Sequence, residues 1–392
     1  MEDLQERQSR LRSQIQALVA AGLGQVQGND DAGTLLHGVL DELRVAFQCE
    51  AGHLYLRQER ELVLLAARNV RITQTELSAR HEETRPLDRR SPAGWAVLTR
   101  QPLLVADVRQ LGGEPGFDPA QDPAGFRTRS LLAIPLIEED GEVCGVLELA
   151  NPVDDSGEPR QLASEEVAAL VQRSEQATRA VQAERLERSY LAAVFDLAAG
   201  VEAKDEEIAG HVRRISGYSA ALARAAGCPP QDVRWIRLAS PLHDLGKVGT
   251  SEAILYKAGK LTDEEFLLTQ RHCQLGWELL GQGELGSSPL FRAAAEIAFT
   301  HHERFDGKGY PRGLGGGDIP LAGRIVAIAD VFDALTTRRT YKPALGVEQS
   351  LRIVRQESAR HFDPELVDTF QGIFAEILDV KNRAEKARGK SS

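Results

Sequence analysis

The stretch HHERFDGKGYPRGL, residues 301–314, is the most informative part of this 392-residue chain, and it follows the shorter stretch HDLGK at residues 243–247. Two adjacent histidines and a separate His-Asp pair are rarely needed to build a fold. They are common in sites that hold two or more metal ions, where imidazoles and carboxylates supply lone pairs and one carboxylate bridges the ions. The sequence therefore predicts a multinuclear metal site to which both stretches contribute.

Helical spacing adds further candidate ligands. Glu207 and His211 are four residues apart in KDEEIAGHVRRISGYSAAL, so they share one face of a helix. Asp330 lies in the apolar helical pattern RIVAIADVFDALTT. A single buried histidine or aspartate is more often a hydrogen-bonded core residue than a ligand, but a concentration of such residues favours a metal site. The candidate ligands are Glu207, His211, His243, Asp244, His272, His301, His302 and Asp330.

These motifs, followed by IPLAGRIVAIADVFDALTTRRTYK at residues 319–342, resemble the HD-GYP family of bacterial phosphodiesterases, which hydrolyse cyclic di-GMP. The resemblance covers residues 190–378 and implies an all-α helical bundle. It implies seven metal ligands among the candidates above, and it matches Glu207 to a further ligand of members that hold three metals. The motif loop that separates this family from other HD hydrolases corresponds to Asp306, Gly307, Gly309, Tyr310 and Pro311.

The chemistry of a phosphodiester agrees with this resemblance. Its hydrolysis needs a nucleophile that is usable at neutral pH and positive charge to neutralise the transition state. Asp244 is placed to bridge two metals that share a hydroxide of lowered pKa, and Lys247, three residues later, is placed to contact a phosphate oxygen. The resemblance implies phosphate contacts for Arg339 and Lys342 as well, with a solvated basic face as the alternative.

The donor types indicate which metal ions to expect. Imidazoles and carboxylates without thiolate suit iron or manganese better than a structural zinc site, although zinc stays an alternative. Two or three divalent ions, Fe or Mn, are therefore the expected cofactors. The chain departs from the family at Val248–Glu252, which reads VGTSE where IGIPD is usual, and at Arg338–Lys342, which reads RRTYK where DRPYK is usual. No candidate metal ligand is affected.

Composition limits the class of protein. The chain is 42% hydrophobic, which is enough for two domain cores, and its net charge of -11 argues against a nucleic-acid-binding surface. No apolar run approaches the ~18 residues that span a bilayer, and the charged start MEDLQERQSR is unlike a signal peptide. The four cysteines form no CxxC pair, which fits reduced thiols. We expect a cytoplasmic protein that contacts neither a nucleic-acid polymer nor a membrane.

Residues 27–161 have a different character from the rest of the chain. Short apolar or alternating runs predict strands, and the Asp140-Gly141 pair between the last two predicts a hairpin. Helical patterns at residues 34–47 and 91–100 alternate with these runs, which predicts an α+β domain with an antiparallel sheet and flanking helices. This order, with RSLLAIPLIEEDGEVCGVLELANP, resembles a GAF domain, a bacterial sensor module. Its small-molecule ligand is unknown.

The remaining segments complete the predicted organisation. Residues 1–26 form an amino-terminal helix with a heptad-like stripe at Leu4, Leu11, Ile15 and Leu18. Residues 162–200 read as a connecting helix whose polar content is too high for burial in one domain, so we expect pairing with a second copy in a homodimer; a solvated single helix is the alternative. Residues 201–378 form the HD-GYP domain, and residues 379–392 form a charged tail.

Two classes of function stay open at this stage. The first is a sensor-regulated enzyme that cleaves cyclic di-GMP to linear pGpG, to GMP, or to both. The second is a cyclic dinucleotide receptor with little turnover, which reports to a protein partner through the loop at Gly309–Pro311. A complete ligand set favours the enzyme, because a receptor has no need of a hydroxide-generating metal pair. A third interpretation is an HD hydrolase that acts on another nucleotide such as cyclic GMP-AMP.

Overall fold

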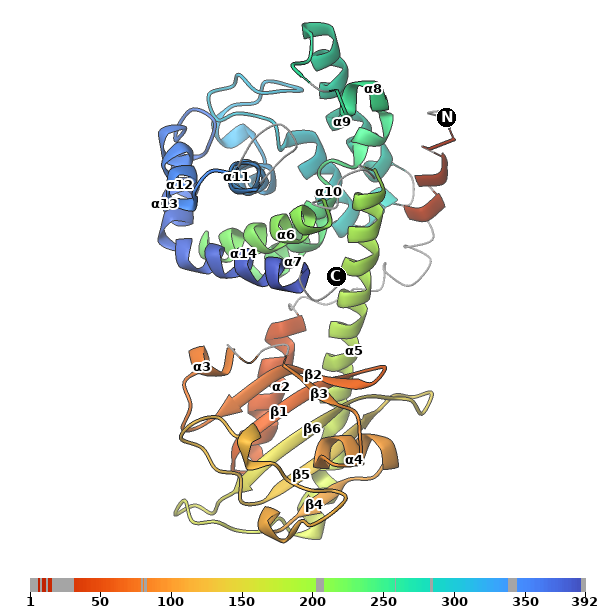
Figure 1. Cartoon of the computed structure of the whole chain (residues 1–392), viewed down its shortest axis with the longest axis vertical. Helices are drawn as coiled ribbons and strands as arrows, with labels where there is room; N and C mark the ends of the chain where they lie inside the picture. The colour runs from red at the N-terminus through yellow and green to blue at the C-terminus, as the bar shows by residue number, and fades with distance from the viewer. Residues whose placement is uncertain are drawn as a thin grey trace. The chain divides into compact units, whose positions relative to one another are not determined.

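The computed structural model divides the chain into two compact units (Figure 1). One unit comprises residues 30–188, and the other comprises residues 189–392 together with residues 1–29. The structure describes residues 6–7, 9–11, 13–15, 32–78, 80, 83–201, 208–257, 259–282, 285–337 and 344–388.

The first unit is built on an antiparallel six-stranded sheet with the order β3-β2-β1-β6-β5-β4. The two edge strands are only three residues long, which leaves little unpaired backbone at either edge. β5 and β6 are joined by the predicted hairpin, where Gly141 has a φ of 85°. The strands are β1 (Cys49–Gln58), β2 (Glu61–Asn69), β3 (Thr84–Pro86), β4 (Leu103–Val105), β5 (Leu131–Ile137) and β6 (Val143–Pro152).

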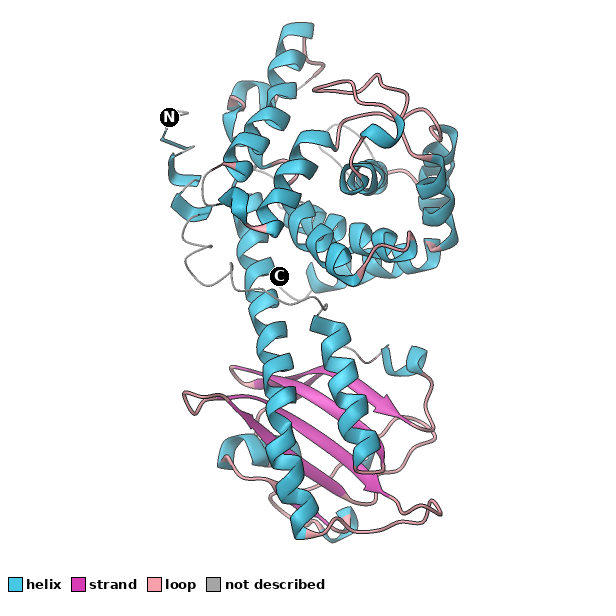
Figure 2. Ribbon diagram, turned by 180° about the vertical axis from the view of Figure 1, so that it is seen from behind, coloured by secondary structure: helices cyan, strands magenta, loops and turns pink. Residues whose placement is uncertain are grey.

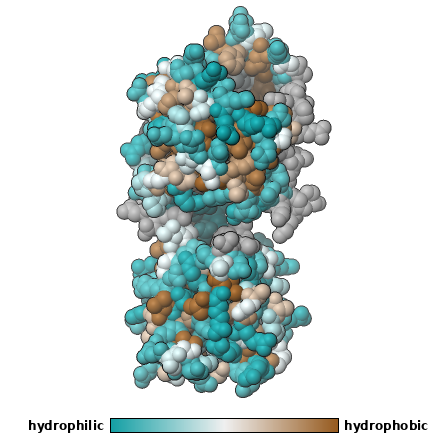
Figure 3. Space-filling view, turned by 90° about the vertical axis from the view of Figure 1, so that its left-hand side faces the viewer, coloured by the Kyte–Doolittle hydropathy of each residue, from teal (hydrophilic) through white to brown (hydrophobic). Residues whose placement is uncertain are grey.

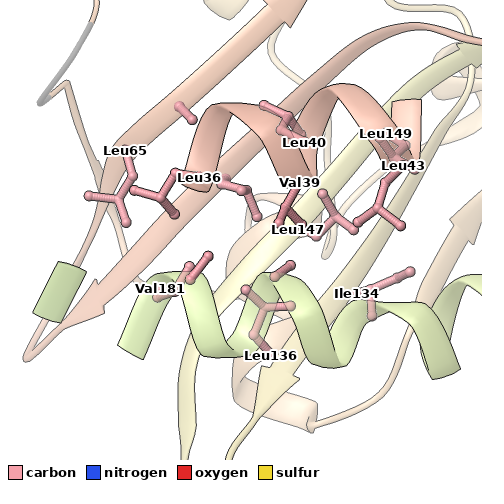
Figure 4. Packing of buried hydrophobic residues seen from close by; sticks show 14 of the residues in the cluster. Leu36, Val39, Leu40, Leu43, Leu65, Ile134, Leu136, Leu147, Leu149 and Val181 are labelled. Carbon is pink, nitrogen blue, oxygen red and sulfur yellow. The ribbon is translucent and has the colours of Figure 1, made fainter. Parts of the chain in front are cut away.

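Two helices cover one face of this sheet, α2 (Ala32–Ala46) and the first half of α5 (Ser164–Val201), as Figure 2 shows. Leu36, Leu40 and Leu43 of α2 point at the sheet, where they meet Leu147 and Leu149 of β6 (Figure 4). Each of these five side chains is at most 2% exposed. This packing is the main core of the unit, and it follows from the 3–4-residue spacing of the leucines in α2.

The opposite face is covered by α4 (Pro92–Thr99) and by connecting segments. α4 begins as its sequence predicts, because Ser91 caps it by accepting a hydrogen bond from the Gly94 amide at 3.1 Å. Short helical turns complete this side of the unit: α3 (Gln74–Ser78), η2 (Val108–Gln110) and η3 (Pro119–Gln121). The structure thus confirms the predicted α+β architecture of an antiparallel sheet with flanking helices.

The long helix α5 corrects one expectation. Its buried positions include Leu170, Ala177 and Val181, which pack on the sheet, and Tyr190 and Val194, which are buried in the second unit. One side of α5 is therefore covered by the chain itself, although the helix as a whole is rich in polar residues. This corrects the expectation that α5 is too polar for burial, while its pairing with a second copy stays a prediction.

The amino-terminal stripe is likewise covered by the same chain. Leu11 is 4% exposed and Ile15 is fully buried. Leu11 lines a cavity of about 640 Å³ together with Leu197 and Val201 of α5. Leu4 and Leu18, the other two positions of the predicted stripe, lie outside the described residues.

The second unit is helical. Its described residues contain helices, short 3-10 turns and isolated β-bridges but no strand, which confirms the predicted all-α bundle. In Figures 1 and 2, α11 is seen nearly end-on with other helices around it. The elements are α6 (Ile208–Ala225), α7 (Pro230–Ala239), η4 (Ser240–Leu242), η5 (Leu245–Gly249), α8 (Glu252–Leu255), α9 (Asp263–Gly281), η6 (Leu285–Ser287), α10 (Pro289–Thr300), η7 (Gly316–Asp318), α11 (Leu321–Thr336), α12 (Val347–Gln356), α13 (Pro364–Gly372) and α14 (Phe374–Arg388).

Much of the segment predicted as a charged tail is helical in the structure. The predicted charged tail starts at residue 379, but α14 continues as a helix to Arg388. Its charged residues pair along the helix, as Lys381 does with Glu385 at 2.8 Å and Arg383 with Asp379 at 2.7 Å. Ile377 at its start is fully buried, so this helix is anchored to the bundle.

The surface is mainly hydrophilic, with scattered hydrophobic patches on the face drawn in Figure 3. Among the described residues, no helix combines the length and the apolar content needed to cross a membrane. Cys49 and Cys144 in the first unit are buried, and burial raises the pKa of each thiol to about 12. Both thiols are therefore protonated at neutral pH, the form that is a poor nucleophile.

Candidate metal centre

Five segments of the second unit deliver the candidate ligands to one place. His211 lies in the first turn of α6, and His272 lies within α9. His243 and Asp244 occupy the junction between η4 and η5, and His301 caps the end of α10. His302 follows directly, and Asp330 lies within α11.

A close backbone approach brings the HDLGK segment to α9. A Cβ atom on Gly246 would lie 1.9 Å from the carbonyl oxygen of His272 and 2.6 Å from the amide nitrogen of Gly276. Only glycine fits there, so Gly246 allows η5 to lie against α9 and places Asp244 beside His272.

The ligand atoms form two groups. In the first cluster, made by Asp244, His272, His301 and His302, one donor atom from each residue lies within 4.8 Å of the others. His211, His243 and Asp330 form the second cluster by the same measure. His211 Nε2 is 3.7 Å from Asp330 Oδ1. The rings of His243 and His301 have centroids 5.1 Å apart, so the two clusters are neighbours.

Asp244 faces both clusters. Its Oδ1 is 3.3 Å from His272 Nε2 and 3.6 Å from His301 Nε2, both in the first cluster. Its Oδ2 is 3.3 Å from His243 Nε2 in the second cluster. This is the arrangement that a bridging carboxylate requires, with one oxygen directed at each position.

Backbone carbonyls orient three of the imidazoles. The Nδ1 atom of His243 lies 2.9 Å from the carbonyl oxygen of Ser240, and that of His272 lies 2.6 Å from the carbonyl oxygen of Thr269. His301 Nδ1 is 3.1 Å from two carbonyl oxygens of α10. With Nδ1 facing a carbonyl, Nε2 points into the site and is the nitrogen that would donate its lone pair to a metal ion, as in metal-binding histidines.

Several of these inward atoms have no partner of their own. Among the described residues, His243 Nε2, His301 Nε2 and Asp244 Oδ1 are buried without a hydrogen bond. Such groups are costly unless something satisfies them. A divalent cation would satisfy all three, so the donor set and its geometry fit a metal centre.

Burial and charge set the protonation of these groups. Burial lowers the pKa of His272 to about 4 and that of His302 well below its usual value, so both rings are neutral lone-pair donors at neutral pH. Burial also opposes the charged form of His243, but the Asp244 carboxylate outweighs it and raises the pKa of His243 to about 9. Burial by itself raises the pKa of Asp244. The charges of Lys247 and His243 outweigh this effect and hold the pKa well below its usual value.

The glycine-rich loop supports the site from one side. The Glu303 carboxylate is 2% exposed and accepts hydrogen bonds from the amides of Arg312 at 2.8 Å and Leu314 at 2.9 Å. These two hydrogen bonds hold the loop that follows Glu303 against the Glu303 side chain. The Tyr310 ring then lies beside His302, with ring centroids 4.7 Å apart.

The structure also describes the other predicted residues of the motif loop, Asp306, Gly307 and Pro311. Asp306 Oδ1 is 3.2 Å from Arg304 Nε and accepts a hydrogen bond from the Lys308 amide at 3.1 Å. Gly307 adopts a φ of 76°, which favours glycine. The peptide bond between Tyr310 and Pro311 is cis.

Of the predicted phosphate contacts, the structure describes Lys247. Its Nζ atom is 2.6 Å from Asp244 Oδ2, and its side chain is 22% exposed. Glu207, Arg339 and Lys342 lie outside the described residues, so their roles stay predictions.

Two residues of the site were missed by sequence reasoning. Asp333 accepts a hydrogen bond from His211 Nδ1 at 2.8 Å, one turn after Asp330 on α11. Its spacing was visible in IADVFDAL, but nothing in the pattern distinguished it from a solvated residue. Glu303 was noted only as part of the motif, because its loop contacts depend on the folded backbone. The Sγ atom of the neighbouring Cys273 lies 3.4 Å from His272 Nε2.

Comparisons with known proteins cover both units. The HD domain model matches residues 197–366, and the GAF domain model matches residues 31–181. The cyclic di-GMP phosphodiesterase response regulator RpfG of Xanthomonas campestris pv. campestris is 34% identical over 304 residues, which cover 72% of this chain and 77% of that protein.

Two further relatives match slightly less than half of this chain. A cyclic di-GMP phosphodiesterase of Thermotoga maritima is 42% identical over 182 residues, 46% of this chain and 49% of that protein. The 3'3'-cGAMP-specific phosphodiesterase 2 of Vibrio cholerae is 42% identical over 188 residues, 48% of this chain and 35% of that protein. The chain thus spans less than half the length of either relative.

Proposed function

This chain belongs to the HD-GYP family of HD-domain phosphodiesterases, and we propose that it hydrolyses cyclic di-GMP under the control of its GAF-type unit. The observation that carries the proposal is the position of Asp244, which directs one carboxylate oxygen at each histidine cluster. Relatives named as cyclic di-GMP phosphodiesterases support the choice of substrate.

The residues that would hold metal ions are those of the first and second clusters, with Asp244 shared between them. Divalent ions bound there would supply Lewis acidity and lower the pKa of a water molecule for attack on the phosphodiester. Lys247 would neutralise charge on a phosphate oxygen, since its ammonium group lies beside Asp244 and is partly exposed. The neutral rings of His272 and His302 would keep their lone pairs directed at the first cluster.

A second substrate is supported by one specific observation. The Vibrio cholerae relative at 42% identity is named as specific for 3'3'-cGAMP, a cyclic dinucleotide with the same phosphodiester ring. A site built around the phosphates would accept either compound unless its base contacts discriminate. We therefore propose cyclic di-GMP as the preferred substrate and 3'3'-cGAMP as the competitor to test beside it. The receptor interpretation is not favoured, because binding alone needs no bridging carboxylate.

Several finer properties belong to the same proposal. We propose iron or manganese as the ions, because the donors are imidazoles and carboxylates. Glu207 would add a third ion, and Arg339 and Lys342 would bind phosphate. A third ion would allow linear pGpG to be cut further to GMP.

Regulation and assembly form the second part of the proposal. The GAF-type unit would bind a small molecule, and α5 would carry the response, since it packs in both units as one helix. A homodimer, a protein partner at the loop Gly309–Pro311 and a cytoplasmic location stay predictions. Light scattering of the full chain at micromolar concentration tests the dimer, and a monomer would remove it.

A direct assay tests the activity. Metal-free full-length protein is loaded with Mn²⁺ or with Fe²⁺ under anaerobic conditions and incubated with cyclic di-GMP, 3'3'-cGAMP and cyclic di-AMP, and products are separated by chromatography. The proposal expects kcat/KM to be highest for cyclic di-GMP and activity to disappear without metal. Metal-loaded protein that binds cyclic di-GMP without hydrolysing it would instead support the receptor.

A further inference from the structure

One histidine of the candidate metal centre is oriented differently from the others. His243, His272 and His301 each face a backbone carbonyl through Nδ1. His211 instead faces a carboxylate, with its Nδ1 atom 2.8 Å from Oδ2 of Asp333. A carboxylate is the stronger acceptor, so it fixes the tautomer more firmly and makes Nε2 a better donor.

The carboxylate is itself held in place. Arg214 donates through Nε to Oδ1 of Asp333 at 2.6 Å and through Nη2 to Oδ2 at 3.0 Å. Arg214 also donates to Thr337 Oγ1 at 3.1 Å. The side chains of Arg214 and Asp333 are 3% and 1% exposed, so this bidentate pair is fully desolvated. Such a planar pair fixes both the position and the plane of the carboxylate.

The geometry extends to one cluster only. His211 Nε2 faces Asp330 Oδ1 at 3.7 Å, and both belong to the second cluster with His243. Asp330 and Asp333 lie on the same helix, α11, which positions the ligand carboxylate and the orienting carboxylate on the two sides of the His211 ring. Within the described residues, the Asp333 carboxylate contacts His211, Arg214 and Thr337 and no residue of the first cluster.

We propose that Asp333 is a positioning residue for the second cluster, holding His211 with its Nε2 lone pair directed at the ion, while Arg214 fixes the Asp333 carboxylate. The inference rests on the proposed metal centre but not on which cyclic dinucleotide is hydrolysed. Removal of an orienting partner of this kind lowers metal affinity by about 10- to 100-fold. That loss should fall on one ion per chain and leave the first cluster loaded.

A second Arg-Asp pair provides a matched control, and its arginine lies on α11. Arg324 of α11 donates to the buried carboxylate of Asp363, which caps α13 by accepting from the Glu365 amide at 2.9 Å. This is also an Arg-Asp ion pair with a buried carboxylate, although Arg324 is 21% exposed, and among the described residues its carboxylate contacts no histidine. Asp363→Asn therefore removes the same charge from the same type of pair and retains the cap.

The test uses full-length, metal-free protein and Mn²⁺ alone as the probe. Bound Mn²⁺ is measured by isothermal titration and by elemental analysis after gel filtration, for wild type, Asp333→Asn and Asp363→Asn. We expect Asp333→Asn to bind one Mn²⁺ about 10- to 100-fold more weakly than wild type, with the other binding step unchanged. Asp363→Asn should match wild type in both steps.

Other results separate the possible failures. Unchanged affinities in Asp333→Asn, or an equal loss in Asp363→Asn, would overturn the positioning role. Wild-type protein that binds no Mn²⁺, Fe²⁺ or Zn²⁺ would overturn the metal centre itself and with it the proposed function.

A measurement on wild type avoids the risk that Asp333→Asn does not fold. Nitrogen-15 NMR of the metal-free protein, at a pH where the ring is neutral, reports which nitrogen of His211 carries the proton. A proton on Nδ1 supports the inference, and a proton on Nε2 would overturn it.

Discussion

The ammonium nitrogen of Lys247 lies 2.6 Å from Oδ2 of Asp244, the oxygen that also faces His243 Nε2 at 3.3 Å. Cations at the two clusters would compete with this ammonium for the same carboxylate and repel it. A repelled Lys247 would turn toward an anionic substrate phosphate. The ion pair therefore suggests that Lys247 serves the carboxylate before metal binding and the substrate afterwards.

Lys247→Ala should separate substrate binding from metal binding. We expect kcat/KM to fall on the order of 100-fold, because one charge-neutralising donor is lost, while the metal content stays that of wild type. Steady-state kinetics and elemental analysis of the same preparation provide the check. Lys257→Ala is the matched control, since Lys257 also pairs with a carboxylate, Glu265 at 2.8 Å, away from the clusters. Loss of metal in Lys247→Ala would show that this lysine supports the site instead.

The shape of the motif loop depends on Gly309. A Cβ atom there would lie 2.3 Å from the Arg304 amide nitrogen and 2.5 Å from the Glu303 Cα atom, and both are backbone atoms that cannot yield easily. Gly309→Ala should cost about 1–3 kcal/mol and displace Tyr310 from the His302 ring. A Cβ on Gly317 in the same loop meets nothing within 4 Å, so Gly317→Ala is the control. Thermal denaturation of both variants is the measurement, and equal midpoints would contradict the packing argument.

Local signals in the sequence were enough to predict most strands and the motif residues. β1, β2, β4, β5 and β6 were predicted, because apolar or alternating runs and the Asp140-Gly141 turn are local signals. β3 was not, since a three-residue edge strand that ends in Pro86 carries no alternation to detect. Half of the candidate ligands, His243, Asp244, His301 and His302, were found because they lie in two contiguous motifs.

The remainder depends on contacts between distant segments. Asp333 acquires its role only when α6 and α11 pack and bring His211 and Arg214 to it, 122 and 119 residues away in the chain. The burial of α5 was missed for the same reason: its polar composition describes the exposed side, whereas the alanine-rich side is matched to a sheet that lies earlier in the chain. Sequence composition averages over the two sides of such a helix.

Glu207→Ala tests the third metal ion. Glu207 precedes His211 by four residues, the spacing of one helical turn, so an additional carboxylate there would raise the positive charge that the site can hold. We expect about one metal ion fewer per chain and a product mixture shifted from GMP toward linear pGpG. The alternative from the sequence is that Glu207 pairs with Arg213 or Arg214 without binding metal; the structure leaves Arg213 as its candidate, because Arg214 is buried and paired with Asp333. Elemental analysis and product chromatography decide between them, and an unchanged stoichiometry with an unchanged product ratio would favour a two-metal site.

The central claim is that Asp244 joins the two clusters into one catalytic metal centre. The most direct measurement is metal content per chain, by elemental analysis, together with turnover of cyclic di-GMP for wild type and Asp244→Ala, with Asp318→Ala as an exposed carboxylate control. We predict that Asp244→Ala loses at least about one metal ion per chain and shows no hydrolysis above background, because the carboxylate that faces both clusters is removed. Near-normal turnover with full metal loading in Asp244→Ala would contradict it.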